Sequence, residues 1–297
     1  MYPFKLTIPD GVTSIGERDF HNHPNLISVT IPASVTSIGE YAFFYCNRLK
    51  KVYFEGTLEQ WLQISFGDVN SMPLLYHLYI NGEEVKDLVI PDGVTSIGDY
   101  TFDGCNWLTS VTIPASVTSI GKHAFCNCDS LTKVDFKGTL EQWLQISFGD
   151  SSSNPLNYVP ELYIDGKVIK DLVIPDGATS IGDYAFSMYD NLTKVTISDS
   201  VTSIGKSAFY YCTNLTGVTI GNGVTIIPWC AFLGCTNLTS ITIPDSVTGI
   251  VGSAFSYCSK LTTVNYRGSA EQWAAISIGS YNTALTGATI NYNYTGE

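Results

Sequence analysis

Charged residues are scarce in this chain of 297 residues, and basic residues are the scarcer kind. Asp, Glu, Lys and Arg make up 14% of the sequence, with 15 Lys and Arg against 27 Asp and Glu, and the formal net charge is −12. An acidic surface repels phosphate backbones and anionic lipid headgroups. We therefore expect no nucleic-acid partner and no attachment to a membrane surface.

Long apolar runs are also missing. No apolar stretch approaches the ~18 residues of a transmembrane helix, so we expect no membrane insertion. Residues 1–4 lead straight into a shortened copy of a repeated motif and do not resemble a signal peptide. We expect the chain to be a segment of a longer protein.

Catalytic motifs are absent as well. The four histidines are His21, His23, His77 and His123, and no HExxH, GxSxG, phosphate-binding loop or dinucleotide motif occurs. A catalytic site needs a nucleophile, a base and an orienting group in one pocket. We predict no enzyme activity, no catalytic residue, no metal and no cofactor. Aspartates that recur after proline fit turns, and a sparse calcium ladder is the alternative.

The sequence is instead rich in repeats of 23 residues. Clear copies begin at Leu26, Leu108, Leu192, Leu215 and Leu238, and one of them reads LTSVTIPASVTSIGKHAFCNCDS. A longer period lies on top, because shorter copies open similar blocks at Leu6, Leu88 and Leu172. The first two blocks share the insertion GTLEQWLQISFGD, and a weaker copy, GSAEQWAAISIG, follows in the third.

One repeat cannot bury its apolar face alone, so the pattern predicts stacked coils. The alternation in LxxVxI indicates a strand, ended by a proline that cannot donate a hydrogen bond to the sheet. Glycine after VTSI is expected in a tight turn, and the Phe of each Ala-Phe pair should stack on its copies. LEQWLQI has helical spacing, and Asn-Gly or Asp-Gly between apolar residues indicates a hairpin.

The predicted fold is a leucine-rich-repeat solenoid, an α/β superfold by classification but mostly β. It has stacked 23-residue coils, a parallel sheet, short inserted helices and β-hairpins. We expect a single solenoid over residues 1–297, with helix-plus-hairpin insertions at 56–87 and 138–171. Residues 268–297 are expected to form a C-terminal helix and cap.

The string LxxVTIPxSVTSIGxxAFxxCxx resembles the BspA-like, or Treponema-type, leucine-rich repeat family, and the match covers roughly residues 4–266. That resemblance implies secreted or surface-displayed bacterial proteins that serve in adhesion or host interaction. It supplies no catalytic or ligand-binding residues, because ligand contacts are not part of the repeat motif. The helix and hairpin insertions depart from the plain repeat.

Six of the eight cysteines share one repeat position, three residues after the Phe. His23 and Tyr189 occupy the same position elsewhere, which favours a packing slot for free thiols. Disulfides between Cys212, Cys235 and Cys258 of neighbouring coils are the alternative. Trp61, Trp143 and Trp273 are expected to hold the inserted helices against the solenoid, and exposed recognition is their alternative role.

Two surfaces are candidates for ligand binding. Most outward strand positions are small hydroxyls, so that face is either solvated or a broad contact surface; its distinctive members are Lys51, Tyr53, Lys133 and Asp135. The second is an aromatic edge after the Phe, because aromatic side chains are favoured anchors at interfaces. Its members are Tyr45, Tyr210, Tyr211 and Tyr257.

These features predict a non-catalytic binding scaffold, secreted or displayed on a bacterial cell surface, that contacts a protein or glycan as a monomer. A structural spacer in a larger cell-envelope protein is the alternative. The duplicated insertions favour the binding scaffold, since a spacer has no need of them.

Overall fold

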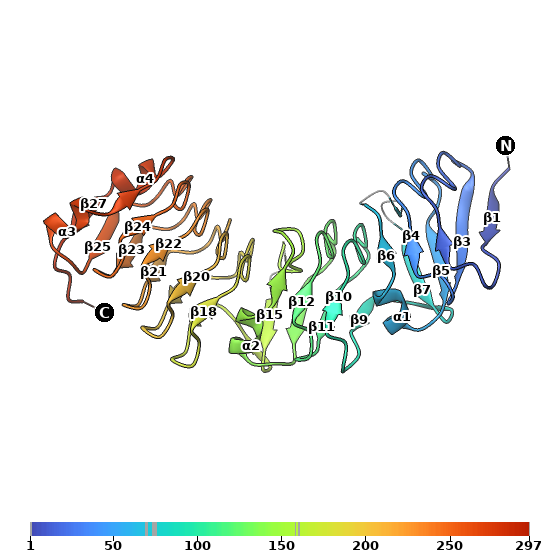
Figure 1. Ribbon diagram of the computed structural model, residues 1–297, viewed down its shortest axis with the longest axis horizontal. Coiled ribbons are helices and arrows are strands. Elements are labelled where there is room, and N and C mark those ends of the chain that lie inside the picture. Colours follow the sequence, from blue (N-terminus) through green and yellow to red (C-terminus); the bar gives the residue numbers. More distant parts are fainter. Residues whose placement is uncertain (1, 69–70, 73–75, 158, 160, 297) are drawn as a thin grey trace. The chain divides into compact units, whose positions relative to one another are not determined.

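The structure, a computed structural model, describes every residue except 1, 69–70, 73–75, 158, 160 and 297. It divides into two compact units, Met1–Lys137 with Ser152–Pro155 and Gly138–Ser151 with Leu156–Glu297. Within each unit, the strands of successive coils lie side by side (Figure 1). The predicted solenoid is confirmed.

Each coil opens with a longer strand, and most of these strands pair in parallel with those of adjacent coils in the same unit. In the first unit these strands are β1 (Phe4–Thr7), β3 (Leu26–Pro32), β5 (Lys51–Glu55), β7 (His77–Ile80), β9 (Asp87–Val89), β11 (Ser110–Ile113) and β13 (Lys133–Phe136). In the second unit they are β15 (Glu161–Ile164), β17 (Asp171–Val173), β19 (Lys194–Thr196), β21 (Gly217–Thr219), β23 (Ser240–Ile243), β25 (Thr263–Tyr266) and β27 (Thr289–Asn291).

The strand register follows the repeat. Val195 faces Val218, and Val218 faces Ile241, so equivalent residues of consecutive coils meet. The alternation puts Val29 and Ile31 inside, and both are fully buried, as is Leu26 at the start of the strand, before a shift in the register. Each predicted proline lies at the last position of its strand or just after it, as expected for a residue without a backbone donor.

A second row of two-residue strands, at Ser-Ile of VTSI, was not predicted. In the first unit they are β2 (Ser14–Ile15), β4 (Ser37–Ile38), β6 (Ser65–Phe66), β10 (Ser96–Ile97) and β12 (Ser119–Ile120). In the second they are β14 (Ser147–Phe148), β18 (Ser180–Ile181), β20 (Ser203–Ile204), β22 (Ile226–Ile227), β24 (Gly249–Ile250) and β26 (Ser277–Ile278). They give each coil a second side on which backbone groups pair between coils.

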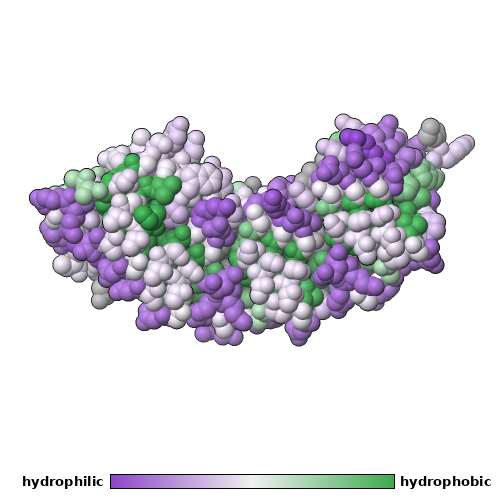
Figure 2. Space-filling view, in the orientation of Figure 1, coloured by the Kyte–Doolittle hydropathy of each residue, from purple (hydrophilic) through white to green (hydrophobic). Residues whose placement is uncertain are grey.

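The predicted phenylalanine ladder is present in both units. Phe209 stacks between Phe186 and Phe232 with ring centroids 5.8 and 5.3 Å away, and both pairs are nearly parallel. In the first unit, Phe102 and Phe125 stack at 5.4 Å. Within each unit, stacked coils therefore share an apolar core. On the face drawn in Figure 2, hydrophobic residues form bands between neutral and hydrophilic ones.

The glycine that follows VTSI opens a turn, as predicted, but for another reason. Gly205 has no positive φ, and a Cβ added there would lie 2.3 Å from the backbone nitrogen of Asp183 in the preceding coil. Glycine at this position therefore lets two coil backbones approach closely.

The six laddered cysteines are buried thiols, so the thiol alternative is the one the structure contains. The sulfur of Cys212 donates to the carbonyl of Phe186 at 3.1 Å, and Cys235 donates to Phe209 at 3.2 Å. Burial raises the pKa of the Cys105 thiol and of the Cys258 thiol, each to about 12. All six thiols fill space; five of them donate to the carbonyl of the Phe in the coil before, and Cys105 donates to the hydroxyl of Tyr76.

We expect the laddered thiols to resist a thiol-specific reagent at pH 8 in the folded protein and to react in urea. The thiolate is the reactive form, and burial both raises the thiol pKa and blocks access. Cys126 is partly exposed and off the ladder, so it is the internal control that should react first. Rapid labelling of several ladder thiols in the folded chain would contradict the packing described here.

The inserted segments form the predicted helices, α1 (Leu58–Leu62), α2 (Leu140–Leu144) and α3 (Ala270–Ala274). Each begins with a capping box, in which Thr57, Thr139 or Ser269 exchanges hydrogen bonds with a glutamine three residues later. Trp61 and Trp143 are fully buried, and Trp143 Nε1 donates to the carbonyl of Ala185 at 3.0 Å. The predicted anchoring role is confirmed for these two tryptophans.

Hairpins follow the first two helices, as predicted. Strand β7 pairs antiparallel with β8 (Glu83–Glu84), and β15 pairs with β16 (Lys167–Val168). Asn81 and Gly82 both have positive φ, which the tight hairpin turn requires. Residues 87–89 leave the hairpin and open the next coil as β9. After α3, the chain forms α4 (Thr283–Thr286) and then β27, which extends the sheet beside β25.

Candidate ligand-binding site

The outward face of the sheet β1–β3–β5–β7 carries two rows of side chains that run across the strands. One row consists of register partners Lys5, Ser28, Lys51 and His77. The other, two residues further along each strand, consists of Thr7, Thr30, Tyr53 and Tyr79. We call these eight residues, with Arg48 and Lys50 just before β5, the strand-face site.

Two tyrosines form the centre of the site. The rings of Tyr53 and Tyr79 stack with centroids 4.9 Å apart and an angle of 30° between their planes. The ammonium of Lys51 lies 5.6 Å from the centroid of Tyr79, within cation–π range. Both rings are half-exposed, so they offer an apolar surface to a ligand while their neighbours hold them in place.

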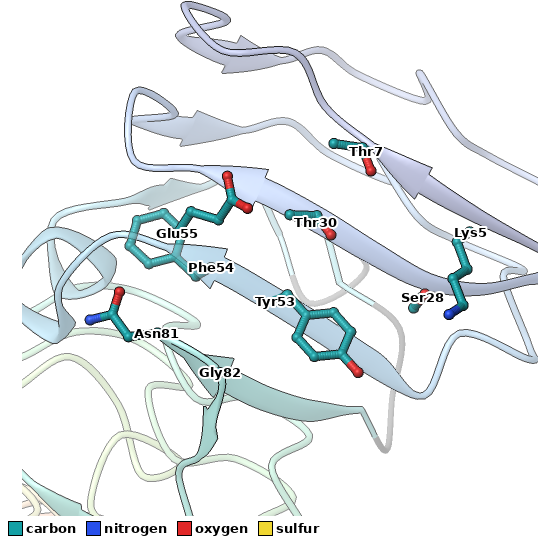
Figure 3. A pocket seen from close by; sticks show the side chains of 9 residues that line it. All are labelled: Lys5, Thr7, Ser28, Thr30, Tyr53, Phe54, Glu55, Asn81 and Gly82. Atoms are coloured by element: carbon teal, nitrogen blue, oxygen red, sulfur yellow. The ribbon is translucent and has the colours of Figure 1, made fainter.

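Two adjoining hollows lie over this face. One has a volume of about 600 Å³ and is lined by Lys5, Thr7, Ser28, Thr30, Tyr53, Glu55 and Asn81, among others. The other, of about 470 Å³, is lined by Lys5, Ser28, Lys51, Tyr53 and the loop residues Asn47, Arg48 and Lys50. Lys5 and Ser28 lie at one end of the first hollow, Tyr53 at its middle, and Glu55 and Asn81 at the other end (Figure 3). Both volumes are in the range of ~300–1,000 Å³ that is usual for ligand pockets.

The charge of the site contrasts with that of the chain. Four of the 15 basic residues gather here, and Lys5, Arg48, Lys50 and Lys51 are all exposed. Within the described part of the chain, none of these four forms a salt bridge. Glu84, the register partner of Tyr79, is hydrogen-bonded to His77, and this bond lowers the pKa of Glu84. The four cations are therefore available to an anionic ligand.

The equivalent face of the second block has a different character, although its strands β9, β11 and β13 match β1, β3 and β5. Lys133 corresponds to Lys51, and Asp135 stands where the first block has Tyr53. The ammonium of Lys133 lies 3.7 Å from Asp135, and Lys137 binds the same carboxylate at 2.8 Å. The predicted pair Lys133 and Asp135 is thus joined within the protein, in contrast to Lys51 and Tyr53.

The predicted aromatic edge is real but spread out. Tyr45 packs on Phe44 in the first unit, and Tyr210 packs on Tyr211 in the second with centroids 4.6 Å apart. Tyr257 is 70% exposed. Burial raises the pKa of Tyr210, which is the least exposed of the four. None of these tyrosines lines the two hollows over the strand-face site, and their binding role stays a prediction.

Sequence reasoning missed Lys5, Arg48, Lys50 and Tyr79. A comparison of the two blocks contains the signal, because the residues equivalent to Lys5, Arg48 and Lys50 are Asp87, Ser130 and Thr132. Tyr79 was assigned to an inserted hairpin, but β7 is also the next strand of the sheet.

The described residues contain no group of three or more His, Cys, Asp or Glu side chains placed to hold a metal ion. Among the helices that the structure describes, none is long and apolar enough to span a bilayer.

Comparisons with known proteins agree with this architecture. The family described as "BspA type Leucine rich repeat region (6 copies)" matches residues 4–72, 74–163 and 160–277. A leucine-rich cell surface protein from Faecalibacterium prausnitzii A2-165 is 28% identical, with a TM-score of 0.51 over 93% of this chain and 91% of that one.

Two other solved structures share the fold. A leucine-rich repeat protein from Eubacterium ventriosum ATCC 27560 has a TM-score of 0.60 at 23% identity, over 99% of this chain and 84% of that one. The pneumococcal vaccine antigen PcpA has a TM-score of 0.55 at 15% identity, over 99% of this chain and 79% of that one. No curated protein matches the chain.

Proposed function

The chain belongs to the BspA-type leucine-rich repeat family, and on that premise we propose that it is a non-catalytic binding scaffold. The observation that carries the proposal is the strand-face site: a stacked tyrosine pair and four cations lie beside two hollows, together with the small hydroxyls of Thr7, Ser28 and Thr30. The stacked coils hold the strands that carry these side chains in a fixed register, which reduces the entropy lost on binding.

The protein acts outside the cell, either secreted or displayed on the surface of a bacterium. The similar structure from Faecalibacterium prausnitzii is of a cell surface protein, and this supports the location. Adhesion or another host interaction through a protein or glycan ligand is the role that such a location favours. The chain works as a monomer, since a solenoid can engage a ligand along one face of its sheet without a second copy.

The experiment is a binding screen of the purified chain against extracellular-matrix proteins, mucins and a glycan array. Three proteins are compared: the unaltered chain, Tyr53→Ala with Tyr79→Ala, and Tyr45→Ala with Tyr210→Ala and Tyr211→Ala. We expect saturable binding that the first variant loses and the second retains, because the stacked pair is the anchor of the site.

The opposite pattern, with binding lost only in the second variant, would transfer the function to the aromatic edge. Binding unchanged in both variants would remove both surfaces from the mechanism. If none of the candidates binds, the spacer in a larger cell-envelope protein becomes the better account. Circular dichroism of each variant shows whether the fold is kept.

A further inference from the structure

The strand-face site also indicates a ligand class, and this inference rests on the binding function proposed above. We propose that the site binds an acidic oligosaccharide that carries a carboxylate on alternate sugars and lies across the strands. Its sugar rings pack on Tyr53 and Tyr79, and its carboxylates meet Lys5 and Lys51.

The first argument is the spacing of charge. In the row Lys5, Ser28, Lys51, a cation alternates with a small hydroxyl on successive strands. Adjacent strands lie about 4.8 Å apart, so the backbones of the two lysines are about 10 Å apart. A sugar in an extended chain advances by about one strand spacing. A carboxylate on every second sugar would therefore meet a lysine each time.

The second argument is the neighbouring row. Tyr53 and Tyr79 present half-exposed rings, and each lies two residues further along its strand than Lys51 or His77. Apolar C–H faces of a sugar can pack on such rings, while ring hydroxyls remain at the edge. Thr7, Ser28 and Thr30 line the hollow and supply hydroxyl partners for them. The site thus combines contacts for a charged group and for a neutral ring.

The third argument excludes a denser polyanion. Nucleic acid carries a phosphate on every nucleotide, and its backbone would continue over a surface whose net charge is −12. Glu55 lines one end of the first hollow and would repel such a chain. A ligand with charge on alternate units can place its neutral sugar near Glu55. Nucleic acid is therefore an outcome of the test and not the proposed ligand.

The second block provides an internal comparison. Asp87 occupies the position of Lys5 and accepts hydrogen bonds from Thr109 at 2.7 Å and Ser110 at 2.6 Å. Lys133, which corresponds to Lys51, lies 3.7 Å from Asp135. The second block thus has the same scaffold, but the position of the first lysine carries a carboxylate and the charge of the second lysine is paired with Asp135. Binding should be confined to the first block.

The test is calorimetric titration of the purified chain with a hyaluronan octasaccharide, which has a carboxylate on alternate sugars. The variants are Lys5→Gln with Lys51→Gln, and Tyr53→Ala; Lys133→Gln is the matched control at the equivalent position of the second block. We expect each test variant to weaken binding on the order of tenfold and the control to bind like the unaltered chain. Binding should also weaken with added salt, because its charge contacts are exposed.

Two further probes separate the possible ligands: a neutral chito-oligosaccharide of similar length and a short single-stranded DNA. Equal affinity for the neutral sugar, tighter binding of DNA, or full binding by the lysine variant would overturn the proposal. So would the absence of hyaluronan binding. In that last case, a ligand from the wider screen that still depends on Tyr53 and Tyr79 would leave the binding function standing. If hyaluronan does not bind and no ligand from the wider screen depends on Tyr53 and Tyr79, both proposals are wrong.

Discussion

Replacing Trp143 with alanine is expected to lower the free energy of unfolding of the second unit by about 3–5 kcal/mol, the usual cost of removing a large buried aromatic side chain. The indole is fully buried and donates a hydrogen bond to the carbonyl of Ala185, which lies 42 residues further along the chain. Its loss leaves a cavity and removes this hydrogen bond. Urea denaturation followed by circular dichroism measures the change.

Trp273 is the matched control, because it has the same place in the third copy of the inserted helix. It is half-exposed, and its ring packs edge-on against Tyr266 at 5.1 Å. Trp273→Ala should therefore cost clearly less than Trp143→Ala. The variant Trp143→Phe keeps most of the apolar contact but loses the hydrogen-bond donor. Its loss of unfolding free energy should lie between those of Trp273→Ala and Trp143→Ala. An equal loss of unfolding free energy for Trp143→Ala and Trp273→Ala would show that burial of the tryptophan is not what anchors the inserted helix.

Much of the fold follows from the sequence because the repeat is regular at every level. The alternation in LxxVxI, the proline after it and the Ala-Phe pair recur with a period of 23, so a strand, its end and a core position are predicted together. The insertion helices could be predicted from apolar spacing and are supported by a capping residue at each start. These features are local in sequence, and the same residues recur in successive coils, so each coil supports the prediction made for the others.

The parts that were missed depend on contacts between coils. The two-residue strands at Ser-Ile are too short for any period to reveal them. The second residue after the Phe adopts a left-handed conformation, with φ near 60° at Tyr45 and 52° at Tyr211. Asn22, Gly104, Asn127 and Gly234 at the same position are a hint of this in the sequence, since those residues tolerate positive φ. That conformation is imposed by the turn that stacking requires.

The candidate site was half predictable for a similar reason. Strand alternation pointed Lys51 and Tyr53 outward, and the structure agrees. Their partners Lys5 and Tyr79 come from strands 46 residues before and 26 residues after them, and only the register of the sheet brings the rows together. Charge pairing is also invisible in sequence, as the contact between Lys133 and Asp135 illustrates.

Stability of the first unit should depend on pH in part through a buried carboxyl, that of Asp103. Asp103 is 7% exposed, its Oδ1 accepts a bond from Asn127 at 3.0 Å, and its Oδ2 has no hydrogen-bond partner among the residues that the structure describes. Burial raises the pKa of Asp103 from 3.8 to about 6, although Asn127 opposes the shift. The folded state therefore holds a proton that the unfolded state has already released when the pH lies between these two values.

Because the folded pKa is the higher one, the contribution of Asp103 is fully favourable below pH 3.8 and is lost as the pH rises through about 6. The shift corresponds to about 2–3 kcal/mol at neutral pH. Asp103→Asn cannot ionise, so it should be more stable than the unaltered chain at pH 7, and this advantage should vanish near pH 4. Urea denaturation at several pH values measures the difference, and the same substitution at the exposed Asp129 is the control. A constant difference for Asp103→Asn would mean that this carboxyl is solvated in the folded protein.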